Sequence, residues 1–253
     1  MRYALCPCVG SVQYVRKSSV SLMLEVGELM RRVALRVLTG AVLLGWSNNF
    51  LCAQTTPSPL EITCSGRCAA TVYAGVHIKT DMEEIFGARG EFTPPWNYQF
   101  GGSYFLGGSL SREIVDLYGV LGVEGEIGAG QRLGSMRESE GWGAIYLRWK
   151  YFPWNGTLRT TIAASTGVSY ASGIPAYEAK SSGNGVGSKT LHYFSPEITF
   201  ARPDNPNTEL VFRIHHRSGG ANWWGEHHPL FGTMFKSING GVQYWTVGIR
   251  QHF

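Results

Sequence analysis

Residues 210–218 read LVFRIHHRS, and their alternation predicts a β-strand with two chemically different faces. Successive side chains of a strand point to opposite sides, so one face carries Leu210, Phe212 and Ile214. The same face continues into His216 and Ser218, which places a candidate base and a candidate nucleophile in line with an apolar stripe. In a soluble protein this stripe would face a core, whereas in a membrane barrel it would face lipid.

The rest of the chain predicts seven further strands, because no stretch after residue 53 shows a sustained helical period. The eight predicted strands lie at about 70–80, 98–110, 117–131, 141–152, 158–170, 188–201, 208–218 and 242–253. Their connections alternate in length: 111–116, 153–157 and 202–207 are short, 81–96, 171–187 and 219–241 are long, and 132–140 is intermediate. Strict alternation is typical of outer-membrane barrels, which have tight periplasmic turns and long outer loops.

We therefore expect an all-β fold, an eight-stranded antiparallel up-and-down transmembrane β-barrel with both termini periplasmic. The interior of so small a barrel is filled by side chains, so charges there must be paired. The predicted register sets Glu124 directly opposite Arg148 and Glu197 opposite Arg213 on the inner face. Pro196 inside a strand predicts a bulge. The competing fold is a soluble β-sandwich or lipocalin-like barrel, which would hide its apolar face inside.

The last strand carries a more specific mark. Trp245, Val247, Ile249 and Phe253 share one face, and Phe253 ends the chain. A terminal aromatic residue on an amphipathic strand resembles the assembly signal of bacterial outer-membrane barrels. Gln251 interrupts the apolar series.

The amino-terminal region predicts export. Met30, Arg31 and Arg32 precede the apolar stretch 37–46, which is too short to span a bilayer, and Ala53–Gln54 is a plausible cleavage point. We expect residues 1–53 to be an upstream segment with a secretory signal peptide and residues 54–253 to be the barrel domain. Residues 1–29 are either an extension ahead of the true start or a long basic leader.

Charge and cysteine content support an exported chain without a nucleic-acid partner. Residues 1–53 carry six of the 22 basic and two of the 18 acidic residues, which leaves a neutral body with 16 of each. Removal of the signal leaves Cys64 and Cys68. Two cysteines at this spacing in an oxidising compartment predict a small local disulfide.

His216-Arg217-Ser218, near the outer end of the penultimate strand, resembles the H-x-S element of the PagL-type lipid A 3-O-deacylase family. Those proteins are eight-stranded outer-membrane barrels that hydrolyse an ester-linked acyl chain of lipopolysaccharide. The resemblance implies that Ser218 attacks the ester and that His216 takes its proton, without a metal or organic cofactor. It also implies lipid A or lipopolysaccharide in the outer leaflet as the partner.

Two departures from the family pattern concern the groups around this pair. The family continues H-x-S with an Asn that helps to hold the oxyanion, where this chain has Gly219. Backbone amides of Gly219 and Gly220, or the Asn222 side chain, are therefore the candidate oxyanion donors. The family orients its His with an acidic residue on the last strand, where the position in register is Gln243. Glu226, in the preceding loop, is a second candidate for that role.

Other interpretations of these residues stay open. Arg217 is a candidate contact for lipid phosphates at the rim, whereas Arg213 is expected to be the interior partner of Glu197. A His or Ser at a strand end is by default an interfacial polar residue, so the alternative function is a non-catalytic barrel with a structural or lipopolysaccharide-binding role. The histidines at 215, 216, 227 and 228 show no fixed ligand spacing, so we predict no metal site. Whether the protein forms a homodimer is open.

Overall fold

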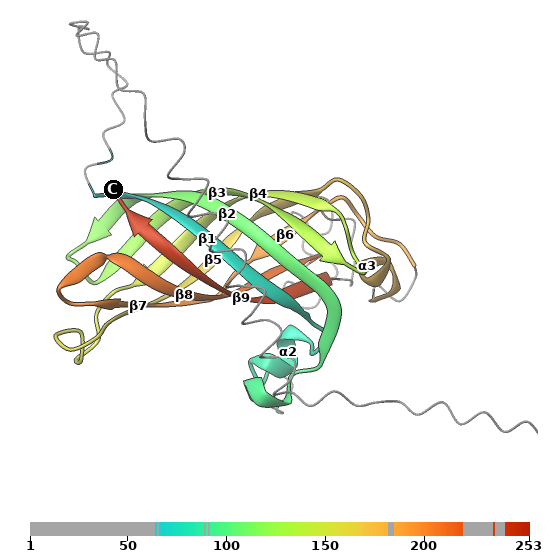
Figure 1. The fold of residues 1–253 in the computed structure, drawn as a ribbon, viewed down its shortest axis with the longest axis horizontal. Coiled ribbons are helices and arrows are strands. Elements are labelled where there is room, and N and C mark those ends of the chain that lie inside the picture. Colours follow the sequence, from blue (N-terminus) through green and yellow to red (C-terminus); the bar gives the residue numbers. More distant parts are fainter. Residues whose placement is uncertain are drawn as a thin grey trace, which may run out of the picture. The chain divides into compact units, whose positions relative to one another are not determined.

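The computed structural model describes residues 64, 66–88, 90, 92–181, 185–219, 235 and 241–253. The chain divides into two units, Met1–Pro59 and Leu60–Phe253, and every described residue belongs to the second. That unit is built from antiparallel strands that follow one another around a ring (Figure 1). The strands are β1 (Cys68–Ile78), β2 (Phe100–Leu117), β3 (Leu121–Gly134), β4 (Ser139–Trp149), β5 (Arg159–Ala171), β6 (Thr190–Phe194), β7 (Glu197–Arg202), β8 (Asn205–Ser218) and β9 (Gly241–His252).

The ring has eight positions, because β6 and β7 share one of them. Both pair with β5 on one side and with β8 on the other. Ser195 and Pro196 separate the two segments, although their carbonyls still accept hydrogen bonds from Ser165 and Ile214. Pairing of β1 with both β2 and β9 closes the ring. The predicted eight-stranded antiparallel barrel and the predicted irregularity at Pro196 are confirmed.

The predicted turn at 111–116 is wrong, since β2 continues through this stretch to Leu117. The reversal lies at Tyr118 and Gly119, which both have positive φ angles, of 58° and 68°. Two consecutive residues in this conformation form the tight hairpin turn whose twist suits antiparallel strands. The Gly119 amide donates to Asp116 Oδ1 (2.6 Å) and stabilises the turn.

Longer strands also change the β3–β4 connection, which spans only residues 135–138. It is shorter than the turn of residues 150–158 at the opposite end, so the alternation of connection lengths is not strict. The register shifts by two residues, and Glu124 lies opposite Tyr146 rather than Arg148. The predicted ion pair nevertheless forms diagonally, with Arg148 Nε 2.6 Å from Glu124 Oε1.

The two faces of the barrel wall differ as a transmembrane barrel requires. Large apolar side chains stay exposed on the outside, including Val72, Leu110, Ile127, Ile145, Leu147, Ile162, Leu210 and Ile249. The buried inner face is instead charged and aromatic. A soluble barrel would have the reverse arrangement, since its apolar residues would fill the interior.

Glu197 is the centre of the inner charges. It contacts three arginines, Arg148 (2.7 Å), Arg213 (2.6 Å) and Arg250 (2.8 Å). Its predicted pairing with Arg213 in register across β7 and β8 is confirmed. Arg213 also binds Glu126 (2.8 Å), so the guanidinium groups are balanced by carboxylates as buried charges must be.

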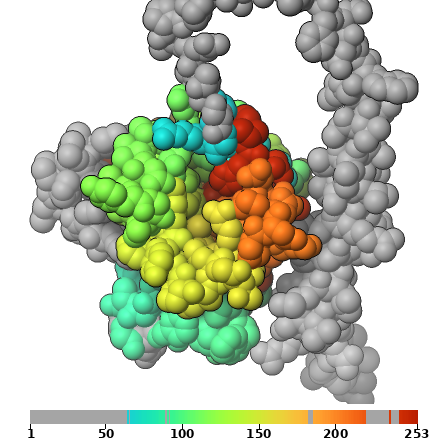
Figure 2. Space-filling view, turned by 90° about the vertical axis from the view of Figure 1, so that its left-hand side faces the viewer, coloured from blue at the N-terminus to red at the C-terminus, as the bar shows by residue number. Residues whose placement is uncertain are grey.

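Figure 2 looks onto the end of the barrel that carries the turns 118–120, 150–158 and 203–204, together with residues 66–68 and 252–253. A polar cavity of about 210 Å³ lies at this end, lined by Arg67, Glu113, Lys150, Glu209 and His252 among others. Further inward the space is filled by the ion pairs around Glu197.

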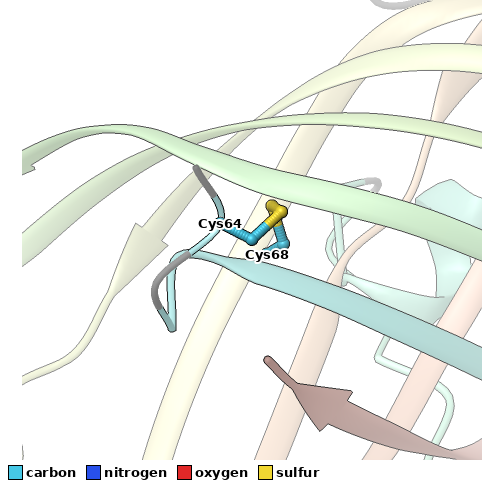
Figure 3. Close-up of a disulfide and its surroundings, with 2 residues drawn as sticks. All are labelled: Cys64 and Cys68. Atoms are coloured by element: carbon cyan, nitrogen blue, oxygen red, sulfur yellow. A yellow bond between two sulfur atoms is a disulfide. The ribbon is translucent and has the colours of Figure 1, made fainter. Parts of the chain in front are cut away.

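A disulfide joins Cys64 to Cys68 where β1 begins (Figure 3). The predicted bridge is confirmed, with the two Cα atoms 5.0 Å apart. The turn that it closes also contacts the end of the chain, because the Gly66 amide donates to the Phe253 carbonyl (3.0 Å).

Three short helices occupy the connections at the opposite end. They are α2 (Met82–Ile85), the 3-10 helix η1 (Pro95–Asn97) and α3 (Ala176–Ser181). In Figure 1, α2 lies beside the strands, whereas α3 lies beyond their ends. None of the helices in the described part of the chain is long and apolar enough to cross a membrane.

Candidate functional site

β8 presents three polar side chains to the inside of the wall and two to the outside near its carboxyl end. Arg213, His215 and Arg217 are buried inside the barrel, whereas His216 and Ser218 alternate with them on the outer face and are partly buried. The apolar stripe of residues 210–214 therefore runs into His216 and Ser218, as the alternation predicts. This arrangement places an imidazole and a hydroxyl on the lipid-facing side of the wall.

Gln243 orients the His216 ring. The two residues are paired across β8 and β9, and His216 Nδ1 lies 2.9 Å from Gln243 Oε1. The Gln243 Nε2 group donates to the carbonyl of Thr80, which leaves its carbonyl oxygen toward the imidazole. An amide oxygen only accepts, so Nδ1 must carry the proton and Nε2 keeps its lone pair. The arrangement makes Nε2 the basic nitrogen of His216, with an amide and not an ionised group as the partner of Nδ1.

Ser218 lies within reach of that ring. Side chains two apart on one strand face are about 6.5–7 Å apart along the backbone. Opposite Ser218 on β9 is Gly241. A Cβ atom placed on Gly241 would lie 2.8 Å from Ser218 Cβ and 3.4 Å from His216 Cε1. Both side chains therefore border the same small volume, and the absence of a side chain at Gly241 keeps it open.

His192 is a site residue that the sequence did not reveal. It lies on β6, where it is paired in register with Ser218. Its Nε2 atom is 3.0 Å from Thr166 Oγ1 on β5, and its ring is 6.0 Å from that of Phe235. Strand alternation alone could have put His192 on the outer face. Its position beside Ser218 depends on the register of β6 after the break at Ser195 and Pro196; Pro196 predicts an irregularity there, but not that register.

The remaining predicted residues fall in three places. Gly219 directly follows Ser218 and is buried. Gly220, Asn222 and Glu226 lie outside the described residues, as do His227 and His228. Among the residues that the structure describes, no group of three or more His, Cys, Asp or Glu side chains is placed to hold a metal ion.

Arg217 does not lie where a contact with lipid phosphates requires. Its guanidinium group is fully buried inside the barrel and donates to the carbonyls of Ser188 (2.8 Å) and Lys189 (3.0 Å). Its Nε atom lies 3.2 Å from Glu178 Oε2 on α3. Strand parity explains the difference, because Arg217 alternates with the outward pair. Arg217 instead links β8 to Glu178, Ser188 and Lys189 of the β5–β6 connection.

Burial gives Glu178 unusual acid–base behaviour. Its side chain is fully buried, and both oxygens lack a hydrogen-bond donor. Loss of solvation raises the pKa of Glu178 to about 7, against the opposing effect of the nearby Arg217 charge. The carboxyl group is thus close to half-protonated at neutral pH.

These observations define a transmembrane β-barrel with a small polar site on its lipid-facing wall. No family model matches the chain, and no curated protein matches it. Among solved structures, the outer membrane enzyme PagL is 11% identical and aligns over 72% of this chain and 98% of its own, with a TM-score of 0.44.

Two further barrels resemble the chain to a similar degree. Neisserial surface protein A (NspA) is 11% identical over 75% of this chain and 98% of its own, with a TM-score of 0.42. The attachment invasion locus protein Ail of Yersinia pestis is 12% identical over 74% of this chain and 99% of its own, with a TM-score of 0.32. No residue role follows from likenesses at this level.

Proposed function

We propose that the protein is an outer-membrane esterase that removes an ester-linked acyl chain from lipid A of lipopolysaccharide. The observation that carries the proposal is the oriented imidazole of His216 beside Ser218 on the lipid-facing wall. Lipid A lies in the outer leaflet, so its ester groups are presented to this wall without leaving the membrane. The H-x-S element resembles that of the lipid A 3-O-deacylase family, which cleaves such an ester.

The chemistry needs only the residues of the wall. His216 Nε2 accepts the Ser218 proton as Oγ attacks the ester carbonyl carbon. The tetrahedral intermediate collapses, its bond to the sugar oxygen breaks, and the imidazolium returns the proton to that oxygen. Water then attacks the acyl-enzyme with His216 again acting as base, which releases the fatty acid and restores Ser218.

The oxyanion needs hydrogen-bond donors that the reaction does not consume. The amides of Gly219 and Gly220 follow the nucleophile directly, and Asn222 adds a side-chain donor. Gln243 holds the ring, and Glu226 is a second candidate for that role. Activity thus depends on a neutral group where the family has a carboxylate.

The experiment is to express the full chain in a cell that bears lipopolysaccharide and to measure the mass of the lipid A from that cell by mass spectrometry. We expect the loss of one hydroxyacyl chain. Ser218→Ala and His216→Ala should each abolish that loss, while Ser111→Ala, at the opposite end of the barrel interior, should leave it intact.

The neutral Gln243 favours a second candidate function, a non-catalytic barrel with a structural or lipopolysaccharide-binding role. An amide cannot stabilise an imidazolium as a carboxylate does. Unchanged lipid A in cells that contain the assembled barrel would select this alternative.

A further inference from the structure

The connection between β1 and β2 forms an apolar projection on the outside of the barrel. Met82 and Ile85 of α2 are buried, and they pack with residues of the outer wall. The wall residues of this cluster are Ile78, Phe194, Ile214 and Trp245. All of them come from strand positions that face outward, so α2 covers the wall and not the barrel opening (Figure 1). We call residues 79–99 the ledge.

Backbone hydrogen bonds connect the two ends of the ledge and also join its two halves. The Lys79 amide donates to the Gln99 carbonyl (2.7 Å), and the Gln99 amide donates to Thr80 Oγ1 (2.9 Å). The Thr93 amide donates to the Glu84 carbonyl (2.9 Å), which ties the second half of the ledge to α2. These bonds join the two halves of the ledge to each other, while Met82 and Ile85 pack against the wall.

Three aromatic side chains of the ledge are exposed over about half or more of their surface. Their exposed fractions are 47% for Phe86, 65% for Phe92 and 79% for Trp96. Three such residues within eleven positions, next to an apolar wall, differ from the scattered exposed residues of an ordinary surface. Trp is enriched where membranes meet water, because its ring suits the boundary between acyl chains and head groups.

The position of the ledge along the wall agrees with this boundary. Ile78 and Phe100, at its two ends, are paired in register. The exposed apolar belt begins a few residues further along, with Leu106 on β2 and, opposite Tyr104 of β2, Leu133 on β3. The acidic residues Glu83 and Glu84 in the first turn of α2 keep the segment from lying wholly in hydrocarbon.

We propose that the ledge is a lipid-binding surface, on which Phe86, Phe92 and Trp96 contact the acyl chains of bilayer lipids. The occupant is hydrocarbon because the ledge continues the apolar belt, which already faces lipid. The inference does not depend on the esterase proposal. It does place bound acyl chains close to the site, since Thr80 near the start of the ledge accepts a hydrogen bond from Gln243.

The test uses photo-crosslinking in the assembled membrane protein, produced from the full chain. p-Benzoylphenylalanine replaces Phe92 or Trp96, and the bilayer contains lipids with deuterated acyl chains, so that mass spectrometry identifies each adduct. Leu110, exposed in the belt on β2, is the positive control, and Arg137, exposed in the β3–β4 connection, is the negative control.

We expect acyl-chain adducts from positions 92 and 96 with a yield comparable to that from position 110, and few from position 137. Adducts from position 110 without adducts from 92 and 96 would overturn the proposal. So would adducts from 137 as abundant as those from 96, because the ledge would then not differ from another exposed loop.

Discussion

The inner and outer faces of β8 hold adjacent histidines in opposite surroundings. His215 is fully buried inside, with Nε2 3.2 Å from Glu140 Oε1 and Nδ1 within hydrogen-bond distance of the Tyr73 (3.4 Å) and Tyr193 (3.3 Å) hydroxyls. His216, on the outside, has the neutral amide of Gln243 as its partner. Inside the barrel a carboxylate is balanced by neighbouring charges such as Arg132. Beside lipid a charged partner would be costly to bury, so the amide of Gln243 orients the His216 ring at lower cost.

The largest effect expected from this comparison concerns activity. His216→Ala removes the proposed base and should lower deacylation on the order of 10⁴-fold, because a positioned nucleophile is ineffective without its base. His215→Ala, on the inner face, should leave the rate per folded molecule close to wild type and lower stability instead. The measurement is lipid A deacylation per assembled barrel, with unfolding followed by the heat-dependent shift in gel migration. Equal loss of activity in both variants would mean that the two faces do not divide these tasks.

A second prediction sharpens the view of the inner face as a balanced set of charges. Glu197→Ala leaves Arg148, Arg213 and Arg250 without their shared carboxylate and should lower the free energy of unfolding by about 3–5 kcal/mol. Asp204→Ala, which breaks the exposed pair with Arg202, is the control and should cost less than about 1 kcal/mol. Urea titration in detergent measures both. A similar small cost for the two variants would contradict the proposed balance.

The third prediction concerns Glu178, a buried carboxyl group whose two oxygens have no hydrogen-bond donor among the described residues. The folded state raises the pKa of Glu178 to about 7, so it binds a proton more tightly than the unfolded chain does. Stability should therefore fall as the pH rises from the ordinary carboxyl pKa through about 7. Glu178→Gln should remove this fall and stabilise the protein at pH 8 on the order of 1–3 kcal/mol. A wild-type protein that gains stability between pH 5 and pH 8, with Gln without effect, would exclude this behaviour.

The smallest expected effect lies on the outer face. Gln243→Met keeps the size of the side chain but cannot accept the hydrogen bond from His216 Nδ1, so the ring loses its orientation. One hydrogen bond contributes about 0.5–1.5 kcal/mol, which corresponds to roughly a 2- to 10-fold loss of rate. Gln251→Met, on the same face of β9 near its other end, should not change the rate. If Gln243→Met leaves deacylation unaltered, Glu226 becomes the better candidate for orienting the ring.

Strand alternation predicted the fold and the two faces of β8 because side-chain direction repeats every two residues. The pairing of His216 with Gln243 followed from counting along two regular strands joined by their hydrogen bonds. Prediction failed where regularity ends. The extension of β2 to Leu117 depends on a turn with positive φ at Tyr118, a residue that rarely adopts it. His192 was missed because its pairing with Ser218 on the adjacent strand depends on the register of β6 after the break at Ser195 and Pro196.

The sequence also misplaced Arg217, for a different reason. Parity put its side chain inside, but its length and charge suggested a group at the rim that reaches outward. The choice was decided by groups in a distant connection, the carbonyls of Ser188 and Lys189. Contacts of this kind depend on how a long connection folds, and no local pattern encodes that path.

The turn between Cys64 and Cys68 lies where the barrel closes. With β6 and β7 counted as one position, consecutive positions of the ring follow one another in the chain except β1 and β9, whose pairing is the seam. Bringing such distant segments together carries the largest loop-closure entropy in the barrel. The bridge between Cys64 and Cys68 shapes the turn whose Gly66 amide meets the Phe253 carbonyl, directly at the end of that seam. A covalent bond that forms where thiols are oxidised thus shapes the segment that touches the end of the seam.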